Sequence, residues 1–104
     1  MYRGTTPIHT ITFDEEVDLS EWQQIWVTYK SRSAERTFEK RELVINEENS
    51  SIQIIFTQED TLKFKNSDTC DIQLRFLKTN GKAGTTNIIS GYPIGRILKD
   101  GVIE

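Results

Sequence analysis

The sequence is poor in the residues that most often carry chemistry or staple a fold. It contains one cysteine, Cys70, and one histidine, His9. A single cysteine excludes an intramolecular disulfide, and one cysteine with one histidine cannot complete the four ligands of a structural zinc site. We therefore expect a fold held together by apolar packing alone, which a chain of 104 residues can achieve.

Long apolar runs are also missing. None approaches the roughly 20 residues that a membrane-spanning helix needs, and residues 1–7 lack the apolar stretch of a signal peptide. The net charge is only −3, with acidic and basic residues interspersed, so no basic surface for a phosphate backbone is expected. We therefore expect a protein that is cytoplasmic when expressed, with neither a membrane nor nucleic acid as its partner.

Alternating apolar and polar residues predict that most of the chain forms short β-strands. The clearest case is residues 51–57, where Ile52, Ile54 and Phe56 share one face. The predicted strands are residues 8–13, 24–30, 36–40, 42–46, 51–57, 70–76 and 85–90.

The segment around Trp22 and Trp26 fits two periods. Leu19, Trp22 and Trp26 fall at helical spacing, whereas residues 24–30 also alternate as a strand does. The run Ile-Trp-Val-Thr-Tyr consists of β-branched and aromatic residues, which favour a pleated sheet. We therefore predict a strand over residues 24–30, preceded by a helical turn over residues 19–23.

Two local signals complete the predicted fold. Thr57 and Asp60 have the spacing of a capping box, which predicts a short helix that buries Leu62 and Phe64. The pair Asn80-Gly81 predicts a tight hairpin turn with positive φ at both central positions. About seven strands with one short helix before the last hairpin indicate a single antiparallel β-sandwich domain over residues 1–104, immunoglobulin-like or related.

The apolar face of each predicted segment defines the expected core. The residues expected to be largely buried are Ile11, Phe13, Ile25, Val27, Tyr29, Phe38, Ile52, Ile54, Phe56, Leu62, Ile72, Leu74 and Phe76.

No motif for catalysis, cofactor binding or metal binding is present. His9 shares its strand face with Ile11 and Phe13, which indicates a partly buried structural residue, and no serine lies in a nucleophile elbow. Cys70 begins an apolar strand face and is expected to be buried and unreactive. The acidic residues 14–18 lack the glycine and the alternating ligands of a calcium loop, so a solvated loop is favoured. We expect no enzyme, no cofactor and no metal.

Trp26 is the residue with the most functional interest. If Ile25, Val27 and Tyr29 face the core, Trp26 lies on the opposite face of its sheet. An exposed tryptophan can stack on a sugar ring or anchor a protein interface. Alternatively, the N-terminal segment or the C-terminal tail covers it.

The two ends of the chain raise a second question. The tail, residues 96–104, contains four large aliphatic residues, Ile97, Leu98, Val102 and Ile103. A disordered terminus normally lacks such residues. Either the tail folds back as a further strand of its own sandwich, or it completes a neighbouring subunit.

Three stretches carry a family resemblance: residues 1–7, residues 56–64 and residues 96–103. Together they resemble a family of short, mostly uncharacterised proteins from phages and prophages of Gram-positive bacteria, encoded among the structural genes. The resemblance implies a phage context and a part of the virion or of its tail or baseplate region, without identifying which part. Together with the missing catalytic motifs, it favours a non-enzymatic structural or assembly protein. Its expected partner is itself, as a homo-oligomer, or another phage structural protein. The alternative is a host-directed binding module that adheres to carbohydrate or inhibits a host protein.

Overall fold

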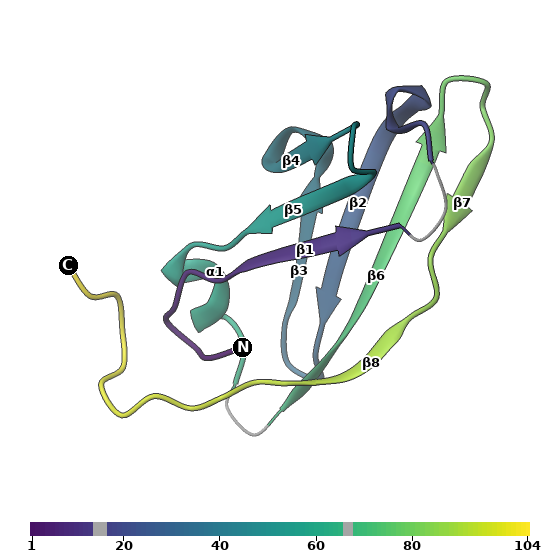
Figure 1. Ribbon diagram of the computed structural model, residues 1–104. Coiled ribbons are helices and arrows are strands. Elements are labelled where there is room, and N and C mark those ends of the chain that lie inside the picture. The colour runs from purple at the N-terminus through teal and green to yellow at the C-terminus, as the bar shows by residue number, and fades with distance from the viewer. Residues whose placement is uncertain (14–16, 66–67) are drawn as a thin grey trace.

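Two antiparallel sheets face each other across one apolar layer in the computed structural model, which describes residues 1–13, 17–65 and 68–104 (Figure 1). The smaller sheet has the strand order β1-β5-β4, and the larger has the order β3-β2-β6-β7, with β8 also paired to β6. The predicted antiparallel β-sandwich is confirmed, with eight strands in the described part of the chain. The strands are β1 (Ile8–Thr12), β2 (Trp22–Lys30), β3 (Glu35–Glu39), β4 (Leu43–Asn46), β5 (Ser51–Ile55), β6 (Thr69–Lys78), β7 (Ala83–Thr85) and β8 (Ile89–Pro93).

Short helical turns connect several of the strands. The predicted capping box is confirmed at α1 (Gln58–Leu62), where the Thr57 hydroxyl accepts from the Asp60 amide at 3.1 Å and the Asp60 carboxylate accepts from the Thr57 amide at 3.0 Å. The predicted turn before β2 is the 3-10 helix η1 (Leu19–Glu21). A second 3-10 helix, η2 (Lys40–Glu42), carries the chain from β3 in the larger sheet to β4 in the smaller one.

The hairpin after β6 differs from the prediction. Of its two central residues only Gly81 has a positive φ, +85°. The Gly81 amide donates to the Lys78 carbonyl at 3.0 Å, and the Lys78 amide donates to the Lys82 carbonyl at 2.8 Å. This pattern is a turn closed by a single glycine in the left-handed region, so Asn80 needs no positive φ.

The prediction of one continuous strand over residues 85–90 is also wrong. The chain forms two separate strands there, β7 and β8, because Thr86 interrupts the ladder. Its hydroxyl accepts from the Leu74 amide at 3.1 Å, and its own amide donates to the Leu74 carbonyl at 2.9 Å. A threonine side chain thus takes the place of a backbone partner. Pro93 is the last residue of β8.

The core follows the predicted faces with exceptions at its margins. Ile11, Phe13, Leu62 and Phe76 are only half-buried, which corrects the prediction for these four. Ile11 lies on β1, an edge strand, and Phe13 follows it. Phe76 stacks on Trp22 with 4.0 Å between ring centroids, over the backbone of Gly84 where a Cβ atom would clash. Three further residues are buried that the alternation does not predict: Leu19, Trp22 and Ile94.

Candidate functional site

His9 lies inside the sandwich as a structural residue. Its Nδ1 atom is 2.7 Å from the Tyr29 hydroxyl, and its Nε2 atom is 3.3 Å from the Tyr92 hydroxyl. Burial, helped by the nearby N-terminal ammonium, lowers the pKa of His9, and burial raises the pKa of Tyr29. Both ring nitrogens of His9 are therefore engaged, and the neutral imidazole is favoured.

The remaining candidates for chemistry are Cys70 and the acidic side chains that could bind a metal. Cys70 is fully buried, as expected, and burial raises the pKa of its thiol, so little thiolate forms near neutral pH. Among the described residues, no group of three or more His, Cys, Asp or Glu side chains is placed to hold a metal ion. Of the acidic segment, residues 14–16 lie outside the described residues.

Trp26 occupies the outer face of the larger sheet, as the alternation of β2 predicts. It is half-buried and lies in one cross-strand row with Glu39 of β3 and Arg75 of β6. Two hollows flank it, and the residues that line them belong neither to the N-terminal segment nor to the tail. These hollows therefore give no support to the interpretation that one of these ends covers Trp26.

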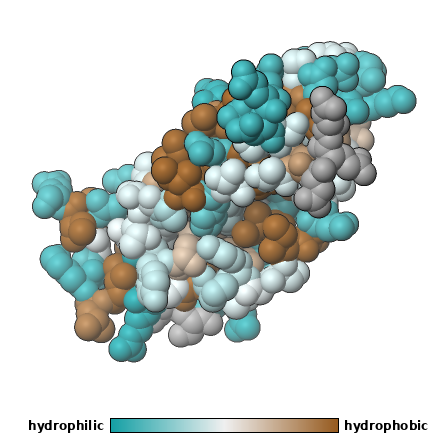
Figure 2. Space-filling model, in the orientation of Figure 1, coloured by the Kyte–Doolittle hydropathy of each residue, from teal (hydrophilic) through white to brown (hydrophobic). Residues whose placement is uncertain are grey.

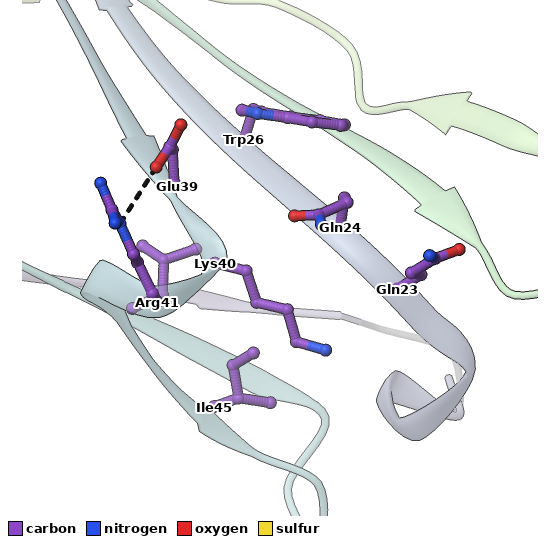
Figure 3. A pocket seen from close by; sticks show the side chains of 8 residues that line it. Gln23, Gln24, Trp26, Glu39, Lys40, Arg41 and Ile45 are labelled. Atoms are coloured by element: carbon purple, nitrogen blue, oxygen red, sulfur yellow. Dashed lines mark ion pairs between the residues drawn. The ribbon is translucent and has the colours of Figure 1, made fainter.

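The larger hollow is a notch at the edge of the sandwich, with a volume of about 960 Å³ (Figure 3). Lys40 extends across it from η2, and its Nζ atom donates to the Trp22 carbonyl at 2.8 Å. Arg41 pairs with Glu39 at 3.1 Å at the rim. The residues that line the notch are Gln23, Gln24, Trp26, Glu39, Lys40, Arg41, Leu43 and Ile45.

The notch exists because β3 is shorter than β2. β6 pairs with β2 from Trp22 to Lys30, whereas β3 pairs with it only from Trp26 to Lys30. At Glu39 the chain leaves the larger sheet through η2 and joins the smaller one as β4. The first residues of β2 therefore have a neighbouring strand on one side only. The sequence signal is the break between the predicted strands 36–40 and 42–46, which does not by itself say that the second strand changes sheet.

The tail lies outside the sandwich but is attached to it. Just before the tail, Gly95 forms a parallel bridge with Tyr2. Within the tail, Asp100 pairs with Arg3 at 2.9 Å. The Ile103 amide donates to the Gln58 side-chain oxygen at 2.7 Å, and the Gln58 side-chain nitrogen donates to the Ile103 carbonyl at 2.9 Å. The tail is thus no further strand of either sheet. Figure 1 shows it running past α1, away from the upper end where β2 begins.

The aliphatic side chains of the tail face solvent. Leu98 is 90% exposed, Ile103 56% and Val102 46%, whereas Ile97 is half-buried against the N-terminal segment. At the left of Figure 2, where the tail lies, brown side chains stand among teal ones. The tail therefore presents three apolar side chains on a backbone that two side chains, Arg3 and Gln58, already hold in place.

Comparisons of the chain with protein-family models, with characterised proteins and with solved structures found no match. In the described ranges, no helix has the length and apolar character needed to cross a membrane.

Proposed function

We propose that this protein is a non-enzymatic structural or assembly module of a phage particle and that it acts by protein–protein interaction. The observation that carries the proposal is the tail, which exposes Leu98, Val102 and Ile103 at the end of the sandwich. The phage context rests on the family resemblance of residues 1–7, 56–64 and 96–103.

Physical chemistry favours the tail as a binding segment. Burial of one large aliphatic side chain contributes about 1.5–3 kcal/mol, so three of them supply a useful part of the free energy of association. The bonds to Arg3 and Gln58 hold the backbone before any partner arrives. A preformed segment loses less conformational entropy on binding than a flexible one.

The placement of the polar residues supports a role without chemistry. His9 is committed to two tyrosine hydroxyls, and Cys70 is buried. A catalytic base or nucleophile would have to be reachable by substrate. Protein binding is what the exposed residues are suited to.

The test is particle composition. The bacterial strain that carries the gene is induced, particles are purified by density gradient, and the protein is quantified by mass spectrometry. We expect the wild-type chain in the particles and a sharp loss of a Leu98→Asp/Ile103→Asp variant that still folds. A matched control, Ile88→Asp/Ile89→Asp, changes two aliphatic residues with 56% and 57% exposure outside the tail and should be retained. Particles that lack the wild-type protein while the lysate contains it would refute the proposal.

A second candidate, carbohydrate adhesion, has one specific observation in its favour. Trp26 lines a second hollow of about 460 Å³ together with Thr28, Thr37 and Arg75, whose polar groups can bond the hydroxyls of a sugar stacked on the indole ring. Titration of Gram-positive cell-wall polysaccharide while Trp fluorescence is recorded tests this candidate. A saturable change that Trp26→Ala abolishes supports it, and an unchanged spectrum contradicts it.

A further inference from the structure

We propose that the tail of one copy docks into the notch of a second copy, with residues 102–104 added as a short strand beside the first residues of β2. This inference deepens the proposed function and rests on it. It names the partner, a second copy of the chain, and the two surfaces that meet.

The backbone of the notch is open to such a strand. β2 has a neighbour on one side only between Trp22 and Ile25, and an unpaired strand edge readily accepts an extended peptide. In the isolated chain Lys40 bonds the Trp22 carbonyl across this opening. The long lysine side chain can withdraw and leave the carbonyl to a backbone amide of the incoming strand.

The apolar groups match by the alternation of a strand. Leu43 and Ile45 face the interior, since they are opposite the buried Ile54 and Ile52, and their half-exposed side chains line the notch. In an added strand Ile103 would point inward to these two residues. Val102 and Glu104 would then lie on the outer face, the face that carries Trp26.

Charge complements the apolar contact. The rim of the notch carries Lys40 and Arg41, and the incoming segment carries Glu104. The Arg41 side chain is 84% exposed and its pair with Glu39 is a surface one, so turning toward another carboxylate costs little. The amide side chains of Gln23 and Gln24 add further hydrogen-bonding groups at the same edge.

The placement of the two surfaces makes the contact intermolecular. Arg3 and Gln58 hold the tail beside α1, away from the end of the sandwich where β2 begins (Figure 1). A tail that meets the notch of another copy gives a head-to-tail contact, with different surfaces on the two partners. Such a contact repeats, as a ring if the rotation closes and as a filament if it does not.

Disulfide trapping tests the contact directly. A chain with Val102→Cys, on the outer face of the added strand, is mixed with a chain with Gln24→Cys, on the same face of β2, under mild oxidation, and non-reducing gels are read. Cys70 is buried and stays in place. We expect the mixed dimer to form at least tenfold faster than with Thr10→Cys, an exposed position on β1, in place of Gln24→Cys. A single chain with both Val102→Cys and Gln24→Cys should give a ladder of dimers, trimers and larger species.

A charge exchange supplies the second arm of the test. Arg41→Glu on the Gln24→Cys chain should slow the cross-link several-fold, and Glu104→Lys on the Val102→Cys chain should restore it. Equal rates at Gln24 and Thr10, or no rescue by the exchange, would overturn the inference. Retention of the wild-type chain in purified particles would then show that the proposed function survives with another partner, and its absence from particles would show that the proposed function fails too.

Discussion

The Nδ1 atom of His9 in β1 lies 2.7 Å from the hydroxyl of Tyr29 in β2, so one hydrogen bond joins the two sheets through the interior. The Tyr92 hydroxyl of β8 approaches the other ring nitrogen at 3.3 Å, and the Phe56 ring packs edge-on against the imidazole at 5.0 Å. A polar group in this setting is stable only while its charge state matches its partners.

The first prediction is therefore a pH dependence set by His9. Its pKa is lowered in the folded protein, so the unfolded chain binds the proton more readily. The stabilising contribution is fully present above the unfolded pKa of about 6.5 and is lost as the pH falls through the lower folded pKa. Thermal unfolding followed by circular dichroism should show the wild type losing stability between about pH 7 and pH 5. His9→Gln should lose much less over the same interval. Parallel curves for the two proteins would contradict this account of His9.

Asp60 carries the second prediction, because it serves two contacts at once. It accepts from the Thr57 amide in the capping box and pairs with Arg36 of β3 at 2.8 Å. Burial alone would raise the pKa of Asp60, but the bonds from Thr57 and Arg36 outweigh it and the pKa is lowered. Asp60→Ala should cost roughly 2–4 kcal/mol of unfolding free energy, from the lost cap and the lost charged hydrogen bond.

A neighbouring carboxylate provides the control for this substitution. Glu59→Ala removes an exposed side chain from the same first turn and should change the unfolding free energy by no more than about 0.5 kcal/mol. Urea denaturation of the two variants measures the difference. Equal midpoints would mean that Asp60 does not link α1 to β3.

The third prediction concerns the register of the core strands. Leu74 of β6 and Ile54 of β5 are almost fully buried, so replacing either by Ala should cost roughly 2–5 kcal/mol through lost burial and the cavity left behind. Val44→Ala on the outer face of β4, where the side chain is 47% exposed, should cost far less. Denaturation midpoints that rank Val44→Ala with the two core variants would contradict the placement of these strands.

Local sequence signals predict much of this fold because they act through neighbouring residues. The alternation of Ile52, Ile54 and Phe56 and the capping box of Thr57 and Asp60 depend only on residues two or three apart. The errors arise where a residue distant in the sequence determines where a strand ends or how deeply a side chain is buried. Thr86 breaks the last predicted strand by bonding the Leu74 backbone, and Phe76 is left half-buried over Gly84 at the margin of the sheet.

The candidate binding surfaces are predictable only in part. The alternation of β2 correctly places Trp26 on the outer face. The four large aliphatic residues of the tail indicate that it packs against something, on its own domain or on a neighbour. The notch depends on where β3 ends and on the crossing of the chain through η2 to the other sheet, which no local pattern encodes. The attachment of Ile103 to Gln58 is likewise a contact between residues 45 positions apart.

Truncation of the tail tests the central claim most directly. Removing residues 98–104 leaves Ile97 in contact with the N-terminal segment and deletes the three exposed aliphatic side chains. Sedimentation velocity is measured for the full-length and truncated chains over a concentration series, with circular dichroism to monitor folding. The account predicts that the truncated chain stays folded and monomeric at concentrations where the full-length chain associates. A full-length chain that is monomeric throughout, together with a truncated chain that unfolds, would contradict it and make the tail a part of its own fold.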